Sequence, residues 1–189
     1  SNGAVIKFDG SSFSEFGPAQ GLKAERIISI FQDSKSNIWF GSRNEGTFKF
    51  DGHRFTNYTM RDGLPHNFIN AIAEDKMGNI WFATNGGATK FDGKIFTNYS
   101  EKNGLGDFIG TVKYDSINKI IWFVTHIGLA SLKWEQVNDD KPVFQHYNPR
   151  TGFNFSKIRD FIIDKQGVLW VLDNGVLRFD YKSIKDLKP

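Results

Sequence analysis

The chain has 189 residues, no cysteine and a formal net charge of +3, so disulfide bonds and thiolate metal sites are excluded. Its Lys and Arg residues form no cluster of the kind that binds nucleic acid, and we expect no nucleic-acid partner. The sequence shows neither a signal peptide nor an apolar stretch long enough to cross a bilayer, so we expect no direct membrane insertion of this segment.

A repeated unit accounts for most of the sequence. At four places a Gly-Leu or Gly-Phe pair stands 18 residues before a tryptophan. The glycines are Gly21, Gly63, Gly104 and Gly152, and the tryptophans are Trp39, Trp81, Trp122 and Trp170. A constant interval of this kind indicates one supersecondary unit used four times. We predict that all four tryptophans are core residues, because an indole ring supplies a large, rigid apolar surface.

The first 16 residues match the second half of such a unit. The tripeptide Phe8-Asp9-Gly10 corresponds to Phe91-Asp92-Gly93, and the stretch from Phe13 to Phe16 corresponds to Phe96 to Tyr99. We therefore predict two strands in residues 1–16, equivalent to the last two strands of a complete unit.

Four short strands are predicted within the clearest copy of the unit. An apolar run from Ile69 to Ala73 gives the first strand, and a polar turn around Asp75 precedes the second strand, from Ile80 to Ala83. A glycine turn then leads to a third strand that ends at Phe91, and the fourth strand runs from Ile95 to Tyr99.

The third unit departs from this pattern in two ways. In the third unit Asp115 comes one residue early relative to Trp122, and extra residues fall near 135–142. We expect the insertion to be a surface loop, with a docking loop for a neighbouring domain as the alternative. In the fourth unit the first strand is predicted from Ile158 to Ile163.

Four short strands in each unit of roughly 40 to 45 residues are typical of a β-propeller blade. The predicted fold is therefore all-β, a β-propeller of four-stranded antiparallel blades. Complete blades are expected at residues 21–58, 63–99, 104–147 and 152–187, with an N-terminal half-blade at 1–16. Because a half-blade leaves an unpaired sheet edge, we expect part of a larger propeller, a homo-oligomer formed through open blade edges, or a small ring.

The stretch from Gly63 to Tyr99 carries a family resemblance. It follows the pattern G-L-x-x-N-x-I-x-x-I-x-x-D-x-x-G-N-I-W-F-x-T-x-G-G-x-x-K-F-D-G-x-x-F-x-x-Y almost completely, which resembles the two-component regulator propeller repeat. The resemblance implies a non-catalytic sensor module, periplasmic or extracellular, from a two-component regulatory system. It also implies an oligosaccharide or other small ligand and, as a neighbour, a further propeller or β-domain of a longer sensor.

Two other functions stay open beside a sensor. The Trp-Phe strand is also similar to that of lyases of the streptogramin-inactivating type, which use a histidine, a glutamate and bound magnesium. The four histidines are His53, His66, His126 and His146. None is repeated or lies in a dense carboxylate cluster, so we expect no catalytic site, no metal site and no cofactor. The third possibility is a scaffold for protein contacts.

Candidate ligand-binding residues come from loops that open on one face of a propeller, around its channel. These are the loops between second and third strands and the loops between blades, and their polar side chains can bind hydroxyl, carboxylate or sulfate groups. The loop candidates are Arg43, Asn44, Arg61, His66, Asn67, Asn85, His126, Arg150, Asp173 and Asn174. Arg159 and Asp160 are added because they interrupt a strand expected to be innermost, where other units hold Ile28-Ser29 and Asn70-Ala71.

Overall fold

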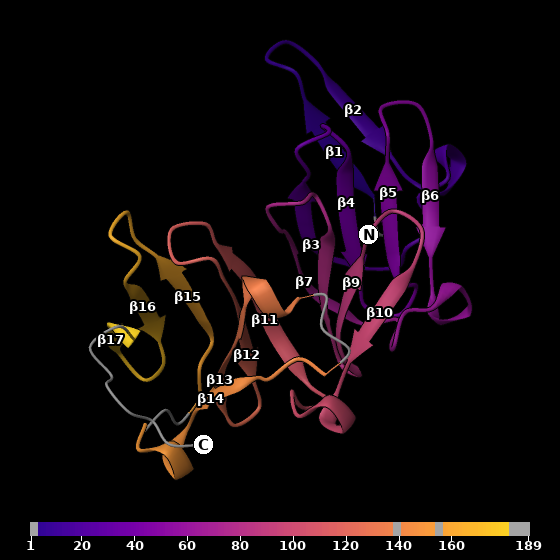
Figure 1. Cartoon of the computed structure of the whole chain (residues 1–189). Helices are drawn as coiled ribbons and strands as arrows, with labels where there is room; N and C mark the ends of the chain where they lie inside the picture. Colours follow the sequence, from indigo (N-terminus) through magenta and orange to yellow (C-terminus); the bar gives the residue numbers. More distant parts are fainter. Residues whose placement is uncertain (1–3, 138–140, 154–156, 182–189) are drawn as a thin grey trace.

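The computed structural model describes residues 4–137, 141–153 and 157–181. These residues form five antiparallel sheets. The sheets follow one another in chain order across the molecule, from indigo to yellow in Figure 1. The fold is a β-propeller built of four-stranded antiparallel blades, as the repeat predicts.

The strands of each sheet are consecutive in the chain. The first sheet pairs β1 (Val5–Phe8) with β2 (Phe13–Phe16). Three four-stranded sheets follow, and the first of them contains β3 (Ile27–Gln32), β4 (Ile38–Ser42), β5 (Thr47–Phe50) and β6 (Phe55–Tyr58). The second contains β7 (Ile69–Glu74), β8 (Ile80–Thr84), β9 (Gly87–Phe91) and β10 (Phe96–Tyr99). The third contains β11 (Ile109–Asp115), β12 (Ile120–Thr125), β13 (Gly128–Lys133) and β14 (Gln145–Tyr147). The last sheet contains β15 (Asp160–Ile163), β16 (Leu169–Leu172) and β17 (Val176–Phe179). The remaining strand expected of the last unit, up to residue 187, lies outside the described residues.

The first strands of successive sheets lie beside one another. Strand β7 contacts β3 on one side and β11 on the other. The first strands therefore line the centre of the propeller. One boundary differs from the prediction: β15 begins at Asp160, so Ile158 and Arg159 precede the strand instead of belonging to it.

Short 3-10 helices between blades explain the repeated glycine. These helices are η1 (Pro18–Gln20), η2 (Met60–Asp62), η3 (Glu101–Asn103) and η5 (Pro149–Thr151). Each ends at a glycine of the repeat in the left-handed conformation, as at Gly63, whose φ is 119°. A residue with a side chain is strained in this conformation, so the position requires glycine. The leucine that follows, Leu64, is buried.

An aspartate fixes the turn between the first two strands of a blade. Asp75 accepts hydrogen bonds from the backbone of Met77 and Asn79 and from the indole nitrogen of Trp81, the last at 2.8 Å. The equivalent pairs are Asp33 with Trp39 at 2.9 Å and Asp164 with Trp170 at 2.8 Å.

The third blade lacks this link, as its longer turn suggests. Asp115 accepts instead from the backbone and side chain of Asn118. The indole nitrogen of Trp122 is buried and has no hydrogen-bond partner among the described residues.

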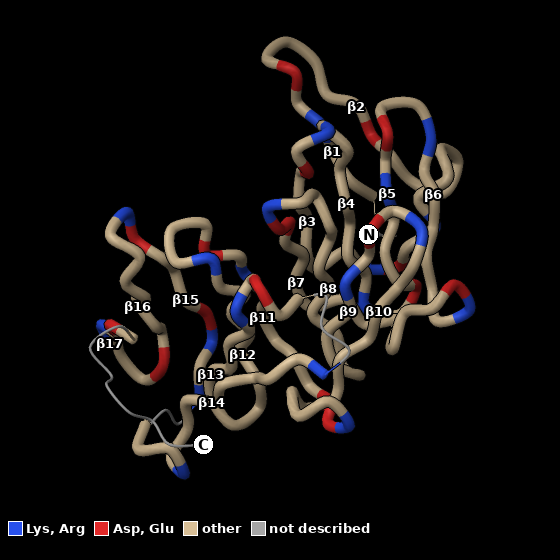
Figure 2. The backbone as a smooth tube through the Cα atoms, viewed as in Figure 1, with Lys and Arg blue, Asp and Glu red and all other residues tan. Residues whose placement is uncertain are grey.

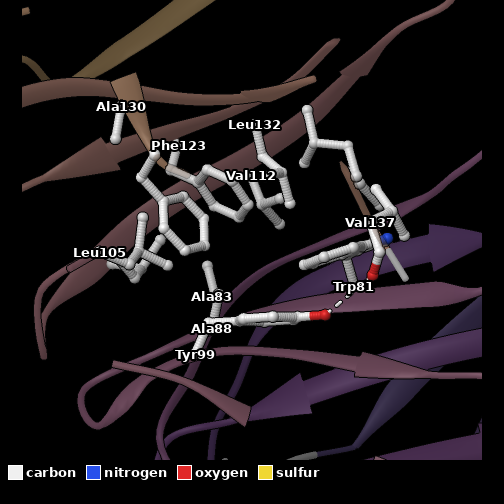
Figure 3. Close-up of a cluster of buried hydrophobic side chains, with 14 residues drawn as sticks. Trp81, Ala83, Ala88, Tyr99, Leu105, Val112, Phe123, Ala130, Leu132 and Val137 are labelled. Carbon is white, nitrogen blue, oxygen red and sulfur yellow. Dashed lines mark hydrogen bonds between the residues drawn. The ribbon is translucent and has the colours of Figure 1, made fainter. Parts of the chain in front are cut away.

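Each buried tryptophan packs between its own blade and the next. The ring of Trp81 stacks on Tyr99 of its own blade and meets Phe123 of the next blade edge-on, at centroid distances of 5.5 and 5.8 Å. Figure 3 shows this cluster, in which apolar side chains of two blades interdigitate. The same arrangement places Trp39 against Phe82.

The prediction that all four tryptophans are core residues is wrong for Trp170. Trp39, Trp81 and Trp122 are at most 2% exposed, whereas Trp170 is 38% exposed. The difference arises because the described part of the chain provides no further blade to cover the ring of Trp170. Its own strand still buries the alternate side chains Leu169 and Val171.

The start of the insertion in the third blade packs against the second blade. Val137 is 1% exposed, and its carbonyl oxygen accepts hydrogen bonds from Tyr99 and Lys90. Figure 3 shows the bond from the hydroxyl of Tyr99. This part of the insertion is thus a contact within the chain, while residues 138–140 lie outside the described residues.

Candidate functional site

A cleft runs along the first strands of three successive blades. Its inner part, of about 650 Å³, is lined by residues that include Glu74, Tyr114 and Asp160. A second part, of about 490 Å³, is lined by loop residues and is called the mouth below. Asn70, Gly110 and Arg159 line both parts, which therefore belong to one cleft.

The strand register explains why these three residues come together. Asn70 is an extra residue in β7, because its neighbours Ile69 and Ala71 pair with consecutive residues of β8. Gly110 occupies the same place in β11. Arg159 stands in the equivalent place directly before β15. A β-bulge re-aims a residue relative to the regular strand, and the bulges at Asn70 and Gly110 turn these two positions toward the cleft that Arg159 also lines.

The side chain of Asn70 bridges two blades at the cleft. Its amide nitrogen donates to the carbonyl oxygen of Ile109 at 2.8 Å and to the side-chain oxygen of Asn85 at 2.9 Å. Asn85, a sequence candidate, therefore contacts a residue of the cleft without lining it. Asn70 itself is absent from the candidates, although its alignment with Arg159 in the repeat pointed to it.

Lys113 is a second residue of the cleft that sequence reasoning missed. Its ammonium group lies 2.7 Å from the carboxylate of Asp160 and also donates to the carbonyl oxygen of Phe161. It sits 4.9 Å from the centre of the Phe161 ring. The carboxylate of Asp160 is thus paired with a cation that joins β11 to β15.

Basic side chains dominate the mouth of the cleft. His126, Lys157 and Arg159 line it together with Phe108, which is 42% exposed. The backbone N–H of Lys157 donates to the buried carboxylate of Asp173 at 2.6 Å. Asp173 therefore fixes the segment that carries Lys157 and Arg159.

The structure brings together three of the sequence candidates in the cleft: His126, Arg159 and Asp160. The other candidates do not line either part of it. Arg43, Asn44, Arg61, Arg150 and Asn174 are exposed elsewhere, and His66 and Asn67 are half-buried. His66 and Asn67 accept backbone hydrogen bonds from Phe68 and Met60, so both brace their own loop.

Charge is distributed evenly over the rest of the molecule. Figure 2 shows basic and acidic residues interspersed along all the sheets. Within the described ranges, no three His, Cys, Asp or Glu side chains gather closely enough to hold a metal ion. The helices in the described part of the chain are all too short to cross a membrane.

The fold and the cleft define the class of protein: a β-propeller with a cleft along its inner strands. Residues 21–44 and 63–86 match the sequence profile of the two-component regulator propeller family. These two segments contain Trp39 and Trp81, the tryptophans of the first two complete blades. No sequence among the curated proteins matches the chain.

Solved propellers of several kinds are similar to this chain, among them extracellular domains of signalling systems. The extracellular domain of a protein assigned as a one-component system of B. thetaiotaomicron is 26% identical, with a TM-score of 0.70 over 83% of this chain and 24% of that one. The extracellular domain of a hybrid two-component system of the same organism is 22% identical, with a TM-score of 0.70 over 89% of this chain and 26% of that one. This chain thus spans about a quarter of those domains.

Another of these kinds is an enzyme. Virginiamycin B lyase from Staphylococcus aureus is 12% identical, with a TM-score of 0.71 over 97% of this chain and 61% of the lyase. At this identity the similarity shows the shared propeller fold alone.

Proposed function

We propose that this chain is a non-catalytic, ligand-binding propeller from the periplasmic or extracellular sensor region of a two-component regulatory system. We further propose that an oligosaccharide occupies the cleft along β7, β11 and β15. The observation that carries this proposal is the convergence of Asn70, Gly110 and Arg159, which hold equivalent positions in three blades, on one cleft.

The size and polarity of the cleft suit a sugar ligand. Its two parts measure about 650 and 490 Å³, and small-molecule sites are typically roughly 300 to 1,000 Å³. A saccharide needs both donors and acceptors around its hydroxyl groups. The inner part offers the carboxylate of Glu74 as an acceptor and the guanidinium group of Arg159 as a donor.

The acidic groups of the cleft are occupied, which favours binding over acid–base chemistry. Asp160 is paired with Lys113. Glu74 accepts hydrogen bonds from the backbone and hydroxyl of Ser34 in the preceding blade, at 2.8 and 2.6 Å. A general acid or base must exchange its own proton with the substrate, whereas these carboxylates are held by neighbours in the protein.

The sensor context is supported by the repeats and by the similar structures. The chain contains the family's repeats, and extracellular domains of signalling systems share its fold. A sensor module must bind its ligand reversibly, and it needs a rigid frame that converts binding into a change of shape or assembly.

Substitution of Gly110 tests whether the cleft is the binding site. The backbone of Gly110 is outside the left-handed region, and a Cβ atom there would lie 3.4 Å from the ring of Phe108. Alanine therefore fits, whereas leucine extends further into the cleft. We expect Gly110→Leu to abolish oligosaccharide binding in calorimetry and Gly110→Ala to retain it.

Two results would contradict this proposal. One is full binding by Gly110→Leu when thermal unfolding shows that the variant is folded. The other is release of a new product from the bound oligosaccharide, which would make the chain an enzyme.

A further inference from the structure

We propose that the mouth of the cleft is an anion site, so that the ligand is an acidic oligosaccharide bearing a carboxylate or sulfate group. This inference rests on the proposed function and adds the chemical class of the ligand. It is carried by two cationic side chains, Lys157 and Arg159, and one exposed aromatic ring, Phe108, that share the mouth.

The first observation is the sign of the charge. His126 comes from the loop after β12, and Lys157 and Arg159 come from the segment before β15. No Asp or Glu of the described residues lines the mouth. A cavity lined by one sign of charge focuses the electrostatic potential and favours a ligand of the opposite sign.

The second observation is that the basic groups lack carboxylate partners. Within the described ranges, neither Lys157 nor Arg159 forms a salt bridge. The nearest acid in the sequence, Asp160, is bound by Lys113 at 2.7 Å. The guanidinium group of Arg159 therefore keeps its planar set of donors for a ligand, and that geometry matches carboxylate and sulfate oxygens.

The third observation is that the excess of positive charge is local. The whole chain has a net charge of only +3, and its basic and acidic residues are interspersed along the backbone (Figure 2). Among the equivalent bulge positions, Asn70 and Gly110 carry no charge, and only the position of Arg159 does. The anion is thus expected at the side of the cleft formed by the last blade.

The aromatic ring in the mouth distinguishes a saccharide from a simple anion. Phe108 is 42% exposed and lines the same hollow as Arg159. A sugar ring has an apolar C–H face that can pack against an aromatic face, while its acidic substituent reaches the basic side chains. An inorganic anion would contact the basic side chains alone, and the ring of Phe108 would stay exposed.

A matched set of ligands and variants tests this inference on the full chain. The ligands are trigalacturonate, its methyl ester, which has the same size without the charge, and a sulfated heparin disaccharide with its desulfated form. The variants are Arg159→Gln and Lys157→Gln in the mouth. Lys165→Gln is the control, because Lys165 is exposed in the β15–β16 turn and changes the net charge equally.

We expect at least one acidic ligand to bind and its neutral counterpart to bind at least tenfold more weakly. Each mouth variant should lower that affinity about tenfold, the factor that corresponds to about 1.4 kcal/mol, and Lys165→Gln should leave it unchanged. Binding should also weaken as salt is added, since the mouth is open to solvent.

The outcomes separate this inference from the proposed function. Equal binding of neutral and acidic ligands would overturn the anion site and leave an oligosaccharide sensor. Binding of an acidic ligand that both mouth variants retain at full affinity would also overturn it, because the anion would lie elsewhere. Failure of every acidic and neutral saccharide to bind would contradict both proposals.

Discussion

The indole nitrogen of Trp81 donates a 2.8 Å hydrogen bond to Asp75, the residue that also holds the turn leading into β8. Asp75→Ala removes these bonds and leaves a buried N–H group unpaired. We therefore expect the free energy of unfolding to fall by about 1 to 3 kcal/mol or more, measured by urea denaturation. Asp164→Ala is the matched control: Trp170 is 38% exposed, so water can replace the carboxylate and the loss should be smaller. Equal losses for the two variants would contradict this account.

Phenylalanine substitutions test the missing link in the third blade. Trp81 and Trp122 are both fully buried, but only the indole of Trp81 has a hydrogen-bond partner among the described residues. Trp81→Phe loses a bond to a carboxylate, whereas Trp122→Phe removes an N–H group that is already unpaired. We expect Trp81→Phe to cost about 1 kcal/mol more in the free energy of unfolding. The opposite order in urea denaturation would show that shape, not this hydrogen bond, decides the cost.

Alkaline pH should weaken the fold through Tyr99. This side chain is buried, and burial raises the pKa of its hydroxyl to about 12 from a reference value of 10.0. The folded chain therefore keeps its proton at pH values where the unfolded chain has lost it. The resulting stability is fully present below pH 10 and is lost as the pH rises from 10 through about 12.

Urea midpoints measured across that pH range should fall steadily. Tyr99→Phe should flatten part of the slope, while a part remains because burial also raises the pKa of Tyr181 to about 12. A stability that does not change between pH 10 and 12 would contradict the assignment.

The ion pair between Lys113 and Asp160 should limit local opening of the last blade. Lys113→Met removes both the ion pair and the bond to the carbonyl oxygen of Phe161. Both charged side chains are partly exposed, so we expect a loss of only about 0 to 1 kcal/mol in global stability. Hydrogen exchange should nevertheless quicken in β15–β17 and not in β7–β10. Arg54→Gln, which breaks an exposed pair with Asp51, should change neither region.

The repetition in the sequence was enough to predict the fold. The interval from Gly63 to Trp81 reflects a left-handed glycine, which recurs at Gly21, Gly104 and Gly152, and a buried indole, which recurs at Trp39 and Trp122. The exposure of Trp170 could not be predicted from the repeat, because it depends on what packs against the blade and not on the sequence of the blade itself. The 3-10 helices were missed since they are only one turn long.

The cleft was only partly predictable. Arg159 and Asp160, which line the cleft, were chosen because they put charges in a strand expected to be innermost. Asn70 was missed because its strand looked regular, and the bulge that turns it toward the cleft appears only in the pairing register. Candidates such as Arg43 do not line the cleft, because the sequence places a residue in a loop without giving the direction of its side chain.

The buried tryptophans all pack in the same direction along the chain, each against the blade that follows. Trp39 is covered by Phe82, and Trp122 is covered by Phe179 and Tyr181, so each of these indoles is covered by the blade that follows it in the chain. Loosening of the last blade would let water reach Trp122 first, and the disturbance would spread toward the amino-terminal blades. A ligand that holds β15 against β11 would keep water away from the indole of Trp122. The fluorescence of Trp122 would therefore report ligand binding in a cleft that Trp122 does not line.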